Sequence, residues 1–219
     1  KAKCAKLFVS AELKKKAALW PENQKIRYRL YNNKEHLLIE EESQSETVEL
    51  SLDSPELWSP SQPNLYKLEL SFYEENQLLD SFTQMIGLRE IELDSSKGFF
   101  INKKRVLLKG VCLHHDLGIL GAAFHRSAAK RQIEKLQEAG VNAIRFSHNM
   151  PAPAYLDLCD EMGLLVINEA FDMWKLSKTQ FDYARFFEDW HAKDVKSWIC
   201  RDRNHPSIIM WSVGNEIYD

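Results

Sequence analysis

The stretch Asp202-Arg-Asn-His-Pro-Ser-Ile-Ile-Met-Trp-Ser-Val-Gly-Asn-Glu216 decides how the second half of this chain folds. Pro206 ends a helix, because proline cannot continue one. The apolar, β-branched run at residues 208–213 is typical of a strand covered on both faces. Gly214, Asn215 and Glu216 then stand at the carboxyl end of this strand, where (β/α)₈ barrels carry their catalytic groups.

The residues before this stretch alternate between strand and helix patterns from about Gly98 onward. We expect strands at 105–112, 141–146, 164–168 and 208–213, with helices at 127–139, 152–162 and 186–203. Ser127 is the expected N-cap of the first helix, and Gly140 and Gly163 are expected to end the first two helices. Such alternation predicts parallel strands with right-handed crossovers. A doubly wound sheet is the alternative, but no glycine-rich phosphate turn follows any strand, which favours a barrel.

Residues 1 to about 93 follow a different pattern. Apolar and polar residues alternate at 26–30, 47–52 and 65–72, as they do in half-buried strands. Turn-forming residues lie between these runs at intervals typical of a β-sandwich. We therefore predict a multi-domain chain, all-β plus α/β. Residues 1–95 form a sandwich of about seven strands, with a β-barrel as the alternative, and residues 96–219 form the α/β domain.

The bulk properties exclude some classes of partner. A formal net charge of −3 gives no electrostatic reason to expect a nucleic acid or an anionic membrane surface. No segment approaches the ~18 apolar residues that span a bilayer. Lys1-Ala-Lys-Cys4 lacks the apolar core of a signal peptide, and the basic run at 14–16 is interpreted as solvated. The cellular compartment stays open.

The four cysteines, Cys4, Cys112, Cys159 and Cys200, show neither CxxC nor Cys/His ligand spacing, which argues against zinc. Three of them lie in apolar stretches, where buried free thiols are expected. The tryptophans Trp20, Trp190 and Trp198 are interpreted as packing residues.

Polar side chains stand at or just beyond the ends of all four predicted parallel strands: His114, Arg145, His148, Glu169, Asp172, Asn215 and Glu216. In a barrel these side chains converge on one face. Aromatic residues accompany them, at Phe146, Phe171, Trp174 and Trp211. Aromatic rings can stack on sugar faces, and neutral His and Asn side chains can bond hydroxyl groups. The pattern favours a polyhydroxylated, uncharged substrate, although a lone strand-end glutamate is more often a solvated or capping residue.

Two long segments carry a resemblance to a known family. The run at 202–216 resembles the acid/base signature of glycoside hydrolase family 2, the β-galactosidase/β-glucuronidase family, and Asn142-Ala-Ile-Arg-Phe-Ser-His-Asn-Met-Pro151 resembles a second signature. The segments 110–116, 87–89 and 58–66 are similar as well. The resemblance runs along essentially the whole chain.

This resemblance implies an immunoglobulin-like sandwich followed by the first half, about four βα units, of a TIM (β/α)₈ barrel. It also implies a retaining exo-β-glycosidase in which Glu216 is the general acid/base. An acid must start protonated, so Glu216 is expected to be partly desolvated or beside another carboxylate. The other implied roles are substrate binding for Asn215, His148, His114, Asp172 and Trp174, and support of the nucleophile for Arg145.

By the same resemblance, Asn215 would bond the sugar 2-hydroxyl, and His114 and His148 would line the sugar subsite. Three other residues have alternative roles. Trp174 lies in a long loop that either roofs the pocket or only packs. His115 and Asp116 either touch sugar or only fix their loop.

The chain departs from the family pattern in two respects. The family's nucleophile, a glutamate on the seventh barrel strand, is expected to be missing, so this chain is interpreted as a fragment that is inactive alone. Glu169 is not expected to replace it. Met173 and Lys175 stand where magnesium-holding relatives carry a carboxylate and a histidine, so no metal and no cofactor are expected. Unpaired half-barrel edges predict self-association.

Two of the motifs indicate which sugar the substrate carries. Gly214-Asn-Glu-Ile217 and Ser147-His-Asn-Met-Pro151 resemble the β-galactosidase branch, so a terminal β-galactoside is the predicted substrate. The β-glucuronidase, β-mannosidase and glucosaminidase branches stay open. A non-catalytic carbohydrate-binding module and a pseudoenzyme are the alternatives from other classes.

Overall fold

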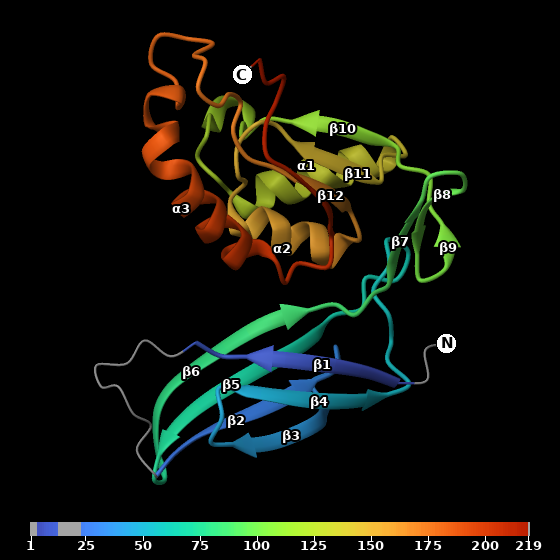
Figure 1. The fold of residues 1–219 in the computed structure, drawn as a ribbon. Coiled ribbons are helices and arrows are strands. Elements are labelled where there is room, and N and C mark those ends of the chain that lie inside the picture. The colour runs from blue at the N-terminus through green and yellow to red at the C-terminus, as the bar shows by residue number, and fades with distance from the viewer. Residues whose placement is uncertain (1–3, 13–22, 219) are drawn as a thin grey trace. The chain divides into compact units, whose positions relative to one another are not determined.

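The computed structural model describes residues 4–12 and 23–218, which form two compact units (Figure 1). The first unit contains Lys1–Trp58 and Asn64–Leu88, and the second contains Ser59–Pro63 and Arg89–Asp219. The predictions for residues 14–16 and Trp20 lie outside the described residues.

The first unit is a sandwich of two antiparallel sheets (Figure 1). One sheet pairs β1 (Cys4–Ser10) with β4 (Thr47–Asp53). The other has the order β3 (Leu37–Ser43), β2 (Gln24–Tyr31), β5 (Tyr66–Glu74) and β6 (Gln77–Ile86). The described part of this unit thus holds six named strands, where the sequence predicts about seven.

Strand β2 illustrates why these residues form a sandwich. Its apolar residues Ile26, Tyr28 and Leu30 are buried in a core shared with Leu50 of β4. The intervening Arg27 and Arg29 take the opposite face, where they form salt bridges of 2.6 Å with Glu42 and Glu40 of β3. The period of two read from the sequence is therefore the alternation between a core face and a solvated face.

A small sheet opens the second unit, with the order β7 (Ile91–Asp94), β8 (Gly98–Ile101) and β9 (Lys104–Arg105). The predicted strand at 105–112 is therefore wrong in its first half. Between β9 and β10 the backbone bonds to the Asn142 side chain: Asn142 Nδ2 donates to the Leu107 carbonyl at 2.9 Å, and Lys109 N–H donates to Asn142 Oδ1 at 2.7 Å. These bonds satisfy backbone groups that a strand would pair with a neighbour.

Four parallel strands follow, β10 (Gly110–Leu113), β11 (Ala143–Phe146), β12 (Leu165–Glu169) and β13 (Ile208–Ser212). They lie side by side in chain order (Figure 1). The chain segments that connect them contain the short 3₁₀ helix η1 (Gly118–Leu120) and the helices α1 (Arg126–Glu138), α2 (Pro153–Met162) and α3 (Ala184–Asp202). A doubly wound sheet reverses its strand order at a switch point. The order β10-β11-β12-β13 contains no reversal, as in a barrel.

The helices also pack on a single face of these strands. Ile144, Phe146, Val166 and Ile208 share one core with α1 and α2. Trp211 lies in register with Asn168 on that same face, and its ring meets Trp198 of α3 edge-on at 4.9 Å. Because all three helices cover one face, the opposite face carries a separate set of side chains, as the inner face of a barrel does.

Helix ends follow the prediction in part. Gly140 and Gly163 take positive φ values of 82° and 72° after α1 and α2, as expected for residues that end a helix. The predicted Ser127 cap is wrong: α1 begins at Arg126, and His125 is its N-cap residue.

Three burial predictions are wrong. β13 is not covered on both faces, since Met210 is 44% exposed, and the described residues give β13 a single neighbour, β12. Of the four free cysteines only Cys159 is buried. Trp198 is buried as expected, whereas Trp190 is 49% exposed, with the Lys193 ammonium over its ring. Among the described residues no helix is long and apolar enough to cross a bilayer.

Candidate active site

The strand register brings three polar side chains together on the face opposite the helices. Arg145 lies one strand from Glu169, and Glu169 is in register with Ser212 on the next strand. Successive side chains of a strand point to opposite faces, and the residues beside these three point toward the helices. Arg145, Glu169 and Ser212 therefore lie on the other face of the sheet. The sequence predicted the site role of Arg145, but not that of Ser212.

The Glu169 carboxylate is the buried centre of this cluster. Its Oε1 accepts from Arg145 Nη2 at 2.8 Å and lies 2.7 Å from His148 Nδ1. Its Oε2 accepts from Arg145 Nε at 2.9 Å and from the Ser212 hydroxyl at 2.6 Å. Burial alone would raise the pKa of Glu169, but the bonds from Ser212, His148 and Arg145 outweigh it and lower the pKa. Glu169 is therefore held as a carboxylate.

Asn215, just beyond β13, extends this cluster toward the loop after β12. Its Oδ1 accepts from Arg145 Nη2 at 2.9 Å, and its Nδ2 donates to Asp172 Oδ1 at 2.9 Å. Asp172 also accepts from Lys178 Nζ at 3.0 Å. Partial burial would raise the pKa of Asp172, but the bonds from Asn215 and Lys178 lower it, so Asp172 too is ionised. Lys178 was not singled out from the sequence.

The two predicted subsite histidines come from neighbouring strand ends. His114 follows β10 and His148 follows β11, and their rings meet edge-on with centroids 5.4 Å apart. The Ser147–His148 peptide bond is cis. The structure thus groups His114 and His148 with Arg145 and Glu169, as the convergence of strand ends requires.

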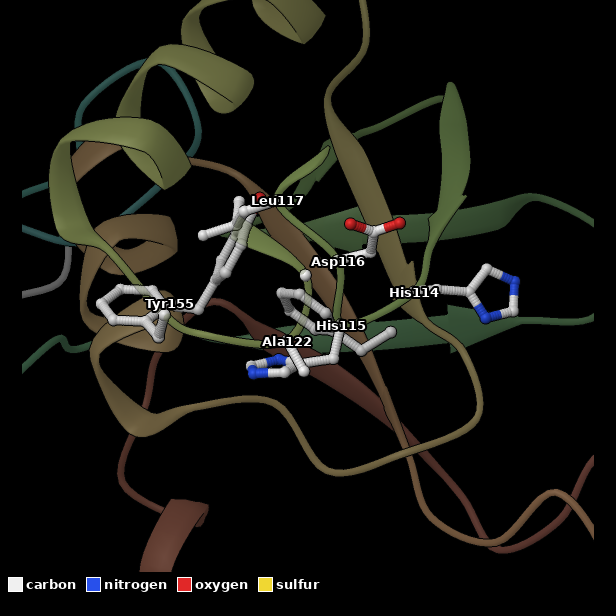
Figure 2. Close-up of a pocket in the computed structure, with 9 residues that line it drawn as sticks. His114, His115, Asp116, Leu117, Ala122 and Tyr155 are labelled. Carbon is white, nitrogen blue, oxygen red and sulfur yellow. The ribbon is translucent and has the colours of Figure 1, made fainter. Parts of the chain in front are cut away.

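His115 follows His114 in the chain. Both histidines line a small pocket with Asp116, Leu117 and Tyr155, next to the core that the helices cover. Figure 2 shows the His114 ring projecting to the opposite side of the chain from the His115 ring. Asp116 Oδ1 accepts from the Gly118 N–H at 2.7 Å, which fixes the loop. Asp116 therefore has the loop role among its two alternatives, while contact of His115 with sugar stays a prediction.

Trp174 packs beside the site. Its indole N–H donates to the Val213 carbonyl at 2.7 Å, and its ring stacks on Phe187 of α3 at 6.0 Å. Gly214 passes so close that a Cβ there would come within 2.9 Å of Trp174 Nε1. Trp174 therefore holds the chain between β13 and Asn215, while its predicted contact with substrate stays a prediction.

Glu216 is the one predicted site residue that stands apart. Its side chain is exposed, and its backbone takes a positive φ of 47°. The partial desolvation expected for it is not seen, because no described segment covers this side of the chain beyond β13.

No group of three or more His, Cys, Asp and Glu side chains able to hold a metal ion occurs within residues 4–12 and 23–218. Met173, at one of the two positions compared with magnesium-holding relatives, is buried. The absence of a metal therefore stays a prediction from those two positions.

Comparison with known proteins agrees with this fold. The family described as "Glycosyl hydrolases family 2, TIM barrel domain" matches residues 91–219, and "Glycosyl hydrolases family 2" matches residues 3–89. Beta-galactosidase BoGH2A of Bacteroides ovatus is 48% identical over 79% of this chain, and a beta-glucuronidase of Bacteroides fragilis is 33% identical over 78% of it. The crystal structure of a beta-glycosidase from Bacteroides vulgatus superposes with a TM-score of 0.92 at 37% identity, over 99% of this chain.

The fold is a sandwich followed by the opening strands of an α/β barrel, with carboxylates at the ends of those strands. The chain belongs to glycosyl hydrolases family 2. It spans 20% of the Bacteroides ovatus relative, 25% of the Bacteroides fragilis relative and 28% of the Bacteroides vulgatus chain, so these 219 residues correspond to part of each.

Proposed function

We propose that these residues are part of a retaining exo-β-glycosidase in which Glu216 is the general acid/base. The observation that carries the proposal is the position of Glu216. It directly follows Asn215, whose side chain joins the Arg145–Glu169 pair to Asp172 across the ends of three adjacent strands. The backbone of Glu216 is thus attached directly to this hydrogen-bonded cluster, and a general acid needs such positioning.

In the proposed reaction Glu216 protonates the glycosidic oxygen while a second carboxylate, about 5 Å away in retaining enzymes, attacks the anomeric carbon. Glu216 then removes a proton from the water that releases the sugar. We place the second carboxylate outside these 219 residues. Glu169 does not fit this role, since it is 1% exposed and each of its oxygens already accepts two hydrogen bonds.

Asn215 and His148 each have a polar atom that the cluster does not use and that can bond a sugar hydroxyl. Asn215 Nδ2 uses one of its two N–H groups on Asp172, which leaves one donor. His148 Nδ1 faces the ionised Glu169 and donates to it, which leaves Nε2 to bond a sugar hydroxyl. We assign these two groups, with His114 beside them, to sugar hydroxyls. Asp172 binds substrate next to Asn215, Trp174 borders the site, and Arg145 supports the nucleophile.

A neutral sugar, with a β-galactoside first, is the proposed substrate. The cations of the described cluster are already paired: Arg145 with Glu169, and Lys178 with Asp172. Such paired cations offer little attraction to a sugar carboxylate. The 48% identical relative is named a beta-galactosidase. A β-glucuronide is the second candidate, because a 33% identical relative is named a beta-glucuronidase.

The test is an assay of the whole protein that carries these residues on a panel of chromogenic β-glycosides, with Glu216→Gln as the variant. We expect turnover of the β-galactoside, and a loss of kcat/KM of roughly 10²–10⁴-fold in Glu216→Gln, as for removal of a general acid. Glu161→Gln, an exposed position on α2, is the matched control and should retain activity.

Each other outcome has a definite meaning. Turnover of the β-glucuronide alone would replace the galactoside with the second candidate. Full activity in Glu216→Gln would overturn the role of Glu216. No turnover on the whole panel would favour a carbohydrate-binding module or a pseudoenzyme over an enzyme.

A further inference from the structure

The loop between β12 and α3 holds the backbone that leads into Glu216. Asn215 N–H donates to the Phe171 carbonyl at 3.1 Å, and the Asn215 carbonyl accepts from Lys178 Nζ at 2.7 Å. Both peptide units that flank Asn215 are therefore bonded to residues 171–178.

The Lys178 bond acts on the peptide unit shared by Asn215 and Glu216. Glu216 has a φ of 47°, in the left-handed region that costs a non-glycine residue free energy. Rotating that peptide unit would relax Glu216 to a negative φ, but it would also turn the Asn215 carbonyl away from the Lys178 ammonium. The bond from Lys178 therefore opposes the relaxation.

Lys178 is itself held in place. Its ammonium also donates to Asp172 Oδ1 at 3.0 Å, and its side chain is 23% exposed. The backbone N–H groups of Lys178 and Thr179 donate to Asp182 Oδ2, at 2.7 and 2.8 Å. A lysine fixed at both its ammonium and its backbone can restrain the carbonyl that it contacts.

We propose that Lys178 is a positioning residue for the acid/base Glu216: its ammonium fixes the Asn215–Glu216 peptide and so the direction in which the Glu216 carboxyl points. The inference rests on the proposed function. Lys178 touches no reacting atom in this role. Its removal should impair proton transfer to the leaving group more than it impairs binding of the sugar.

The experiment compares Lys178→Met, which keeps an unbranched side chain out to the ε-carbon and removes the ammonium, with Lys175→Met. Lys175 is in the same loop, has a 62% exposed side chain and pairs with Glu188 of α3. Both variants of the whole protein are assayed on two aryl glycosides of the sugar that it hydrolyses. One glycoside has a dinitrophenyl leaving group, which departs without protonation, and the other has a phenyl leaving group, which needs the acid.

We expect Lys178→Met to lower kcat/KM on the phenyl glycoside by roughly 10–100-fold, a fraction of what general acid catalysis supplies, and on the dinitrophenyl glycoside by less than about 3-fold. Lys175→Met should match the wild type on both. An equal loss on both glycosides would mean general damage to the site and would overturn the inference, as would no loss on either.

A second measurement does not depend on activity. Amide hydrogen exchange in residues 213–218 should be faster in Lys178→Met than in Lys175→Met, because the clamp on Asn215 is gone. If Lys178→Met does not fold, Lys178→Gln is measured in its place. If the wild type is inactive on every glycoside, the proposed function is overturned, but the restraint of Asn215 by Lys178 is still tested by amide exchange. Unchanged exchange in a folded Lys178 variant defeats the positioning role.

Discussion

Buried Glu169 and partly exposed Arg145 form the charge pair to which the other polar residues of the cluster are bonded. The carboxylate is held by Arg145, His148 and Ser212, and Arg145 in turn bonds Asn215. Removing one member of a buried pair leaves the other charge uncompensated, which destabilises a protein more than the pair itself stabilises it. Single substitutions here should therefore affect stability as well as activity.

Glu169→Gln should lower the free energy of unfolding at pH 7 by about 2–4 kcal/mol, somewhat less than for a fully buried pair because Arg145 is partly exposed. Urea unfolding of the whole protein checks this. The control is Glu161→Gln, which removes an exposed carboxylate that also bonds one arginine, Arg126, and should change the value by less than about 1 kcal/mol.

The lowered pKa of Glu169 also sets a pH dependence. Its stabilisation is present above the unfolded-state pKa of about 4.3 and is lost as pH falls through the lower folded-state pKa. Between pH 6 and pH 3 the wild type should thus lose more free energy of unfolding than Glu169→Gln does. Parallel pH profiles would show that the carboxylate is not stabilised in the folded state.

Gly163→Ala tests a position where only glycine fits. Gly163 has a φ of 72°, and a Cβ there would come within 2.3 Å of the Pro60 carbonyl oxygen. We expect a loss of about 2–4 kcal/mol in the free energy of unfolding, from the left-handed backbone and the displaced loop together. Gly140→Ala has a similar φ of 82° with open space around it, so it should cost only about 1 kcal/mol.

At the scale of elements, the first half of the 202–216 motif joins α2 to β13 instead of entering the site. Asp160 of α2 lies 2.6 Å from His205 Nδ1 and accepts from the Ser207 N–H at 2.9 Å. The Arg89 guanidinium donates to the carbonyls of Pro206 and Ile208. These bonds fix where β13 starts, and so where it delivers Asn215 and Glu216.

The contact between Asp160 and His205 predicts a second pH dependence. Burial would lower the pKa of His205, but the hydrogen bond and charge of Asp160 raise it. The stabilisation is therefore complete below the unfolded-state pKa of about 6.5 and is lost as pH rises through the raised folded-state pKa. Amide exchange at Ser207 and Ile208, corrected for its intrinsic pH dependence, should report more frequent opening as pH rises above about 6.5.

Asp160→Asn should remove that extra opening with pH, since the neutral amide no longer favours charged His205. His125→Asn, a change at the exposed N-cap of α1, is the control and should leave the profile as in the wild type. If amide exchange at Ser207 and Ile208 has the same pH dependence in Asp160→Asn as in the wild type, the charge on His205 does not control this opening.

At the scale of the whole molecule, we expect the 219-residue chain alone to show no glycosidase turnover, because the proposed nucleophile is a residue outside it. β10 and β13 each have a single strand neighbour among the described residues, and unpaired edges favour association between copies. Light scattering of the chain should show mass rising with concentration. Turnover by the chain alone would place the nucleophile within these residues.

The sequence by itself determined the elements and the family. Period-two runs predicted the sandwich, and glycine stops such as Gly163 located the helix ends, because these signals come from local backbone sterics and from which face is buried. The strand–helix alternation suited both a barrel and a doubly wound sheet, and the lack of a glycine-rich phosphate turn favoured the barrel-type strand order that the structure has. The candidate residues Arg145, His148 and Asn215 were found because each stands at or just beyond a strand end.

The tertiary structure decided which of these residues meet. Lys178 and Ser212 carried no signal, because their partners Asn215 and Glu169 lie 37 and 43 positions away in the chain. The rings of His114 and His115, which follow β10, project to opposite sides of the chain, and this depends on the backbone of the loop (Figure 2). Burial of β13 and of the cysteines was misjudged because burial depends on neighbouring elements, whereas an apolar run records only what a segment is able to bury.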